Sequence, residues 1–180
     1  MVPHEHASQY GIGEMMLSRT FDAPRELVFE AWTRPEHMSQ WWGPAGFTNP
    51  VCELDVRPGG VIRIEMHGPD GDIFPMSGVF DEVVAPSRLV FTSAPHETPA
   101  TVSSGKRESV KNCPLTSQWI RTTVTFVAQA EKTVLTVRAE LLTATPEESS
   151  ACLDGMKAGW NGSLERLVEH LADALASSSS

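Results

Sequence analysis

The pattern of hydrophobic and polar residues has a period of two in the middle of the chain. In the segment VIRIEM, Ile62, Ile64 and Met66 share one face, while Arg63 and Glu65 take the other. This alternation is typical of a half-buried antiparallel strand. Similar segments predict further strands at 14–21, 47–56, 73–84, 88–93 and 119–128, with a last strand that ends at 141. We therefore expect an antiparallel sheet of about six or seven strands.

A helical period appears on both sides of this series. Leu27, Val28 and Trp32 have helical spacing within 25–33, and Pro35 both ends that segment and opens a second short helix, EHMSQWW. From Pro146 onward, apolar residues recur every three or four positions, which predicts one long amphipathic helix. Its apolar stripe comprises Leu153, Met156, Trp160, Leu164, Leu167, Leu171 and Leu175.

These elements predict one α+β domain in which the long helix covers the apolar face of the sheet. A chain of 180 residues has room for one hydrophobic core. We expect the domain to span 14–175, with disordered segments at 1–13 and 176–180, because both ends lack hydrophobic periodicity. The segment 95–117 is rich in Pro, Ser and Thr and is predicted to be a long loop or an insertion.

Composition limits the partners of this domain. The net charge of −9 opposes binding to nucleic acid. No apolar run approaches the roughly 20 residues needed to cross a bilayer, so membrane insertion is not expected. The first residues do not resemble a secretion signal, which favours a cytoplasmic location. Cys52, Cys113 and Cys152 are widely spaced and are predicted to be reduced thiols.

Candidates for chemistry are few. His4 and His6 lack a fixed third ligand, so we predict no metal site. The sequence contains no glycine-rich phosphate loop, and we expect no cofactor. Glu53, Asp55 and Arg63 would offer an acid or base if they were buried, but a solvated face of the sheet is the favoured interpretation. We predict no catalytic residue.

Five motifs occur together in a fixed order: DAPR at 22–25, WWGP at 41–44, PGG at 58–60, SG at 77–78 and GWNGSL at 159–164. With this set, the chain resembles the activator-of-heat-shock-protein-90-ATPase C-terminal family of the START-like, or SRPBCC, superfamily, over 17–171. The resemblance implies a helix-grip fold, in which a curved antiparallel sheet wraps around the C-terminal helix. It also implies two short helices after the first strand and an apolar cavity between helix and sheet.

The resemblance and the apolar pattern together predict a small hydrophobic ligand, such as a lipid, a polyketide or an aromatic metabolite, in that cavity. The alternatives are a co-chaperone-like domain that binds heat-shock protein 90 and stimulates its ATPase, and an enzyme similar to polyketide cyclases or aromatases. The residues favour a binding protein over an enzyme, and they leave monomer and homodimer open. The predicted ligand-binding residues are Trp41, Trp42, Ile64, Met66, Phe80, Phe91, Trp119, Met156 and Trp160.

Three glycines in the long helix need a reason, because glycine is a poor helix former. Gly155, Gly159 and Gly162 fall within eight positions of the apolar stripe near Trp160. One interpretation is close packing of the helix on the sheet. The other is that the missing side chains leave room for a ligand beside Trp160.

Overall fold

The computed structural model describes residues 13–94, 118–143 and 146–178. Its elements follow the predicted order closely. They are β1 (Gly13–Phe21), α1 (Arg25–Thr33), α2 (Pro35–Trp41), β2 (Thr48–Leu54), β3 (Val61–His67), β4 (Ile73–Val84), β5 (Arg88–Ser93), β6 (Ile120–Gln129), β7 (Lys132–Leu141) and α4 (Pro146–Ser178).

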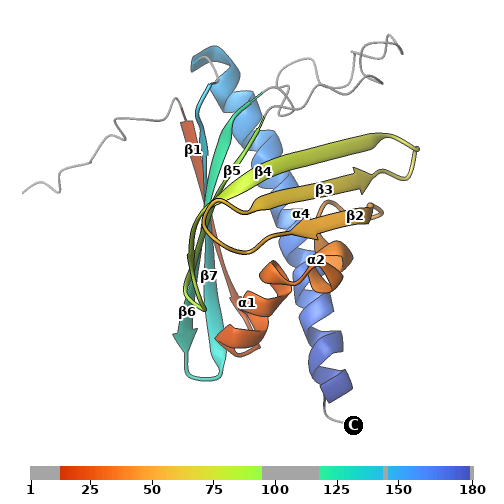
Figure 1. Ribbon diagram of the computed structural model, residues 1–180, viewed down its shortest axis with the longest axis vertical. Coiled ribbons are helices and arrows are strands. Elements are labelled where there is room, and N and C mark those ends of the chain that lie inside the picture. Colours follow the sequence, from red (N-terminus) through yellow and green to blue (C-terminus); the bar gives the residue numbers. More distant parts are fainter. Residues whose placement is uncertain (1–12, 95–117, 144–145, 179–180) are drawn as a thin grey trace, which may run out of the picture.

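Seven strands form one antiparallel sheet in the order β1-β7-β6-β5-β4-β3-β2. The sheet is bent: β1 and β5–β7 are seen nearly edge-on at the left of Figure 1, whereas β2–β4 extend to the right. The helices α1, α2 and α4 lie in the angle between these two parts (Figure 1). The α+β helix-grip architecture predicted from the sequence is therefore confirmed.

Alternation decides which side of the sheet each residue faces. In β7, the buried residues Leu135, Val137, Ala139 and Leu141 alternate with partly exposed ones. In β6, the even-numbered residues Thr122, Val124 and Phe126 are buried in the same way. Because side chains in a strand point alternately to opposite faces, these rows form one apolar floor under the helices.

A register shift in β4 interrupts the regular alternation of inward and outward side chains in that strand. The β4–β5 pairing moves by one residue between Phe80 and Glu82. An irregularity of this kind bends a strand and increases its twist. It lies where the sheet turns from its β5–β7 part to its β2–β4 part, and it leaves Phe80 buried against the interior.

The break between α1 and α2 has a local cause. Arg34 is extended, with φ −105° and ψ 123°, as expected for a residue that precedes proline. Pro35 then occupies the first turn of α2, where its missing N–H is not needed. The Arg34 side chain forms ion pairs with Glu30 on α1 and Glu36 on α2. Two short helices at an angle therefore replace one longer helix.

Some predicted boundaries differ from the structure. The helix α4 continues to Ser178, beyond the end expected at 175, and β1 begins at Gly13. Of the predicted disordered segment 1–13, residues 1–12 lie outside the described residues, as does the predicted loop at 95–117. Among the helices that the structure describes, none is long and apolar enough to cross a membrane.

Candidate functional site

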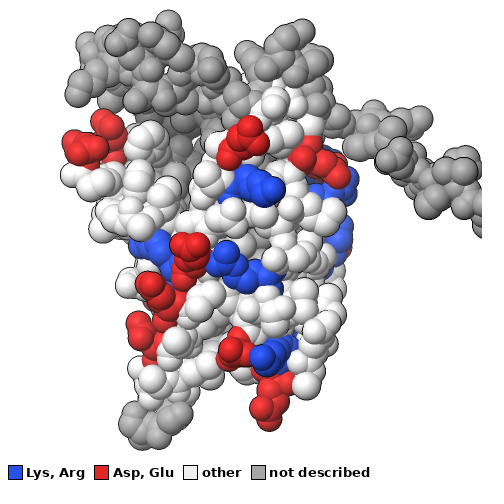
Figure 2. Space-filling view, turned by 180° about the vertical axis from the view of Figure 1, so that it is seen from behind, with Lys and Arg blue, Asp and Glu red and all other residues white. Residues whose placement is uncertain are grey.

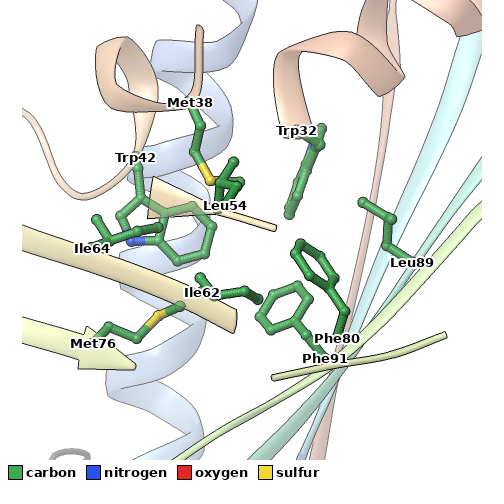
Figure 3. Close-up of a pocket in the computed structure, with 10 residues that line it drawn as sticks. All are labelled: Trp32, Met38, Trp42, Leu54, Ile62, Ile64, Met76, Phe80, Leu89 and Phe91. Carbon is green, nitrogen blue, oxygen red and sulfur yellow. The ribbon is translucent and has the colours of Figure 1, made fainter. Parts of the chain in front are cut away.

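An apolar pocket lies between the two short helices and the β2–β5 part of the sheet (Figure 3). Every one of its lining side chains is hydrophobic. The helix α1 contributes one, α2 together with the residue after it contributes two, and the strands β2 to β5 contribute the rest. The lining residues are Trp32, Met38, Trp42, Leu54, Ile62, Ile64, Met76, Phe80, Leu89 and Phe91.

The pocket is nearly filled by its own side chains. Its volume is about 10 Å³, which is enough for about one water molecule. A water there would find no polar partners among these hydrophobic side chains, and apolar cavities of this kind stay dry. Any larger occupant therefore has to displace lining side chains.

Four tryptophans support the roof of the pocket. Trp32 stacks on Trp160 of α4, with ring centroids 5.7 Å apart and an interplanar angle of 17°. Trp42 meets the edge of Trp160 at 5.2 Å. Trp41 packs against Trp32 at 4.8 Å, and its Nε1 donates a hydrogen bond of 2.9 Å to the carbonyl of Ala31. The cluster joins α1, α2 and α4, because each helix contributes at least one ring to it.

The structure separates the predicted ligand-binding residues into three groups. Trp42, Ile64, Phe80 and Phe91 line the pocket. Trp41, Met66, Met156 and Trp160 are packed in or against the core and lie outside the lining. Their expected contact with a ligand stays a prediction, and their position gives each of them a structural role.

The inward direction expected for Trp119 is wrong. Its side chain is 44% exposed, and it precedes β6, which begins at Ile120. The reason is the parity of the strand, since Thr122, Val124 and other even-numbered residues of β6 face inward. Counting back from Val124 along the sequence would have placed Trp119 outside.

Six lining residues were not on the predicted list, although several carry a signal in the sequence. Ile62 and Leu89 share strand faces with Ile64 and Phe91 and could have been found by alternation. Leu54 enters the site through its pairing with Ile62, which requires the register of β2 on β3. The remaining three are Trp32, Met38 and Met76.

The long helix does not line this pocket, although the ligand was expected between α4 and the sheet. All ten lining residues come from segments that precede residue 92. The contribution of α4 is indirect and passes through Trp160, which stacks on the lining residue Trp32. The short helices intervene because they occupy the angle of the bent sheet (Figure 1).

Two of the three glycines in α4 do not lie at a close contact between the helix and its neighbours. A Cβ atom built on Gly155 or Gly159 would meet no heavy atom within 4 Å. At Gly162, a Cβ atom would stand 3.6 Å from Pro44 Cα, which is an ordinary contact. Close packing is therefore the wrong explanation for Gly155 and Gly159, and the space beside them is open.

Arg166 of α4 fixes the segment that carries Trp42. Its guanidinium donates hydrogen bonds of 2.9–3.1 Å to five backbone carbonyls around the end of α2. Burial lowers the pKa of Arg166, and the nearby Glu169 opposes that shift. The carbonyls belong to Gln40, Trp42, Gly43, Pro44 and Phe47.

Gly43 completes this anchor. Its φ of 89° is in the left-handed region, which favours glycine. In this conformation, its N–H donates a hydrogen bond of 3.1 Å to Ser163 Oγ on α4. The turn after Trp42 is thus held from two adjacent turns of the same helix.

The acid or base considered on the sheet is solvent-exposed. Glu53 lies opposite Arg63 in the β2–β3 register, and their side chains are 62% and 55% exposed. Asp55 forms an exposed ion pair with Arg57 at 2.8 Å. The favoured interpretation, a solvated face of the sheet, is confirmed. Within the described residues, no group of three or more His, Cys, Asp or Glu side chains is arranged to hold a metal ion.

The cysteines differ from expectation. Cys152 on α4 is disulfide-bonded, so the prediction of three reduced thiols is wrong. Cys52 on β2 is a free thiol, and burial raises its pKa to about 11, with a further contribution from Glu36. Disulfides are rare in reducing compartments, so this bond does not support the cytoplasmic location expected from the sequence. That location stays a prediction.

Charges are dispersed over the face opposite to the view of Figure 1. Figure 2 shows red and blue side chains interspersed there with uncharged surface, and no broad blue area. On α4, Glu165, Glu169 and Asp173 are exposed. This face therefore lacks the continuous basic patch that phosphate backbones require.

The comparisons with known proteins agree with this fold. The family model of Activator of Hsp90 ATPase homolog 1-like proteins matches residues 22–172. Among curated proteins, none matches the sequence.

Solved structures of bacterial proteins resemble the whole domain. A protein of Nitrosomonas europaea is 26% identical, with a TM-score of 0.72, and the match covers 92% of this chain and 97% of that one. A protein of Chromobacterium violaceum is 22% identical, with a TM-score of 0.70 and coverages of 88% and 97%. An AHSA1-like protein of Aeromonas hydrophila is 21% identical, with a TM-score of 0.64 and coverages of 89% and 94%.

Proposed function

This chain belongs to the family of Activator of Hsp90 ATPase homolog 1-like proteins, and on that premise we propose that it binds a small, neutral, aromatic molecule in the pocket under α1 and α2. The observation that carries the proposal is the lining, which is wholly hydrophobic and contains four aromatic rings (Figure 3). A charged ligand would lose its hydration there without gaining a partner. A flat ring can stack or meet the edges of Trp32, Trp42, Phe80 and Phe91.

The small volume of about 10 Å³ supports a ligand that enters by displacing side chains. Met38 and Met76 are the suitable candidates, because methionine is unbranched and adapts to irregular spaces. Met38 is buried on α2, and Met76 is half-buried on β4. Movement of these two side chains would make room for one or two fused rings rather than for a long acyl chain.

The expected affinity follows from the buried area. Burial of about 200 Å² of ligand surface at about 25 cal/mol per Å² contributes about 5 kcal/mol before the entropy of association is subtracted. Because 1 mM corresponds to about 4.1 kcal/mol and 1 μM to about 8.2 kcal/mol, the affinity should be weak, with a dissociation constant of about 0.2 mM or higher. A panel of fused-ring aromatics, flavonoid-like compounds and fatty acids should give a thermal shift for the first class. A ligand at about 100 times its dissociation constant would raise the melting midpoint by roughly 5–10 °C.

The double substitution of Met38→Leu and Met76→Leu tests the site itself. Leucine preserves the hydrophobic volume, so each of the two substitutions should cost less than about 1.5 kcal/mol of stability. Its branched side chain is less adaptable, so binding of the best fused-ring compound should weaken several-fold in calorimetric titration. Met156→Leu is the control, because Met156 is buried like Met38 but lies outside the lining. Wild-type affinity in the double variant, or an equal loss in the control, would contradict the proposed site.

A second candidate function, stimulation of the heat-shock protein 90 ATPase, is favoured by the description of the matched family. Addition of this chain to the chaperone would then raise its rate of ATP hydrolysis, with or without a pocket ligand. The third alternative, an enzyme similar to polyketide cyclases, has less support. Among the described residues that line the pocket, no side chain can donate or accept a proton at neutral pH.

A further inference from the structure

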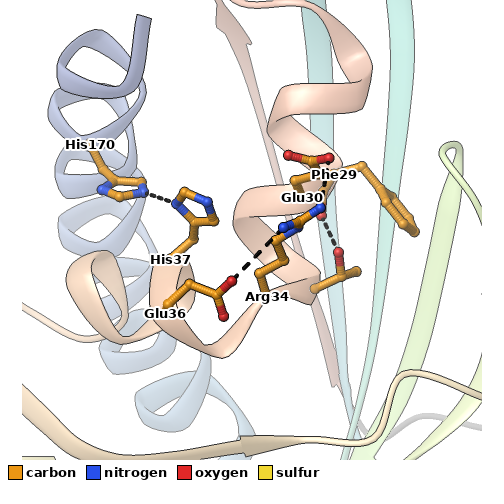
Figure 4. Close-up of polar contacts among 7 residues, drawn as sticks. Phe29, Glu30, Arg34, Glu36, His37 and His170 are labelled. Atoms are coloured by element: carbon orange, nitrogen blue, oxygen red, sulfur yellow. Dashed lines mark hydrogen bonds and ion pairs between the residues drawn. The ribbon is translucent and has the colours of Figure 1, made fainter. Parts of the chain in front are cut away.

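Two histidines from different helices form a contact beside the roof of the pocket. His37 Nδ1 on α2 and His170 Nε2 on α4 are 3.0 Å apart (Figure 4). The rings meet edge to face, with centroids 5.2 Å apart, and the contact is partly buried. At this distance one nitrogen carries the proton and donates it to the lone pair of the other.

This hydrogen bond tolerates one positive charge but not two. With one imidazolium in the pair, the charged ring donates and the neutral ring accepts, so the bond persists and is charge-assisted. With two imidazolium rings, both nitrogens carry a proton and neither can accept. The hydrogen bond is then lost, and two like charges face each other at the same place. Histidine undergoes this change within the range between about pH 5 and 8.

The surroundings oppose the second charge only partly. Desolvation lowers the pKa of His170, His37 lowers it further, and Asp173 on α4 raises it. Glu36 and Arg34 adjoin His37, but the Arg34 guanidinium lies 4.0 Å from Glu36 and 3.3 Å from Glu30 on α1. These contacts are also drawn in Figure 4.

Two further charges lie on the α4 side of the contact. Arg166, one turn before His170, is occupied by backbone carbonyls. Glu169 adjoins His170 in the sequence and interacts with Arg166. Asp173 is therefore the carboxylate that acts directly on His170.

A lowered pKa has a definite consequence for stability. The unfolded chain takes up a proton at the ordinary histidine pKa of 6.5, whereas the folded His170 takes it up at lower pH. The contribution of His170 is therefore fully present above pH 6.5 and is lost progressively as the pH falls through the folded pKa. Acidification weakens the contact rather than strengthening it.

The position of the pair connects it with the pocket. The seven residues of α2 are fixed at their C-terminal end by Arg166, through the carbonyls of Gln40 and Trp42. His37 fixes the other half of α2 to the same helix, and the next residue, Met38, lines the pocket. Loss of the His37–His170 bond would remove the side-chain hydrogen bond that ties the half of α2 carrying Met38 to α4, while the half beside Trp42 keeps its contacts with Arg166.

We propose that the His37–His170 pair is a pH-sensitive switch, which releases the first half of α2 from α4 when both rings are protonated and thereby opens the apolar pocket. The opening step rests on the proposed binding function. The release of α2 does not, because it depends only on the contact between the two helices.

The first experiment tests the release without a ligand. Melting midpoints are measured at pH 7.5 and pH 5.0 for the wild type, His170→Gln and His37→Gln. Glutamine cannot be protonated, so the wild type should lose roughly 2–4 °C more than either variant on acidification. His67→Gln is the control, because His67 lies on β3 and faces Glu65 at 3.6 Å; it should retain the wild-type loss. Equal losses in the wild type and in both pair variants would overturn the switch.

The second experiment tests the pocket with the neutral fluorescent probe phenylnaphthylamine. Its association rate should rise several-fold between pH 7.5 and pH 5.0 in the wild type and in His67→Gln, and should stay unchanged in His170→Gln. Binding at equal rates at the two pH values would overturn the link between the switch and the pocket. Absence of binding at every pH, with the difference in midpoints intact, would overturn the proposed function and leave the release of α2 supported.

Discussion

At the scale of the residue, the positions that matter most around the pocket are those that do not touch it. Trp160 does not line the pocket, yet it stacks on Trp32, which does. Arg166 contacts only the backbone near Trp42, and five carbonyls depend on its guanidinium. The lining is thus held in place by side chains on a helix that contributes nothing to its surface.

Arg166→Met should destabilise the protein by about 2 kcal/mol, because five carbonyls, three of them in partly buried contacts, then lose charge-assisted hydrogen bonds. Arg166→Lys should recover only part of the loss, since an ammonium group cannot reach the same set of acceptors. Urea denaturation monitored by circular dichroism measures both values. Arg88→Met is the control: Arg88 forms an exposed pair with Glu82 at 3.1 Å, and such pairs contribute about 1 kcal/mol or less. Similar losses at the two positions would contradict the role of Arg166.

At the scale of the element, α4 combines a well-buried apolar stripe with a segment of low helix propensity. Leu164, Leu167 and Leu171 are buried in the core, whereas Gly155 and Gly159 face open space. A helix can retain such glycines when tertiary packing, rather than intrinsic propensity, supplies most of its stability. The segment of low helix propensity includes the turn that precedes Trp160, so it adjoins the tryptophan cluster.

Gly155→Ala and Gly159→Ala should each stabilise the protein by about 0.5–1 kcal/mol, because alanine has the higher helix propensity and its Cβ meets no obstacle. Gly78→Ala is the contrasting control, since its Cβ would stand 2.6 Å from the carbonyl oxygen of Thr92; it should destabilise. Midpoints of urea denaturation compare the three variants. A loss of stability in both helix variants would show that these glycines are needed for a reason other than local packing.

At the scale of the whole molecule, one core connects all elements. The buried residues run without interruption from β1 through the short helices and the sheet to α4. A bent sheet with α1, α2 and α4 in its angle leaves no boundary between separately folding parts of the described residues (Figure 1). The fold should therefore behave as one cooperative unit.

Unfolding in urea should follow a single transition. Tryptophan fluorescence reports on Trp32, Trp41, Trp42 and Trp160 at the junction of the helices, and far-ultraviolet circular dichroism reports on the sheet and on α4. The two midpoints should coincide, because the cluster cannot open while the core is intact. An earlier fluorescence midpoint would show that the helical roof separates from the sheet before global unfolding.

The sequence by itself determined the elements, their order and the class of the fold, since these depend on local signals. Alternation in VIRIEM predicted β3, Pro35 predicted the break between α1 and α2, and the leucine stripe predicted α4. Alternation alone would also have placed Trp119 outside and Ile62 inside. These outcomes need only the direction in which each side chain leaves its own backbone.

The tertiary structure decided which apolar face became a pocket. Nothing local shows that α1 and α2 would occupy the bend of the sheet and exclude α4 from the lining, or that His37 would meet His170 across 133 positions. The environment of Arg166 likewise depends on a turn far away in the sequence. Such contacts arise from how separate elements share one core, and a hydrophobic pattern records that a residue is buried without recording against what it is buried.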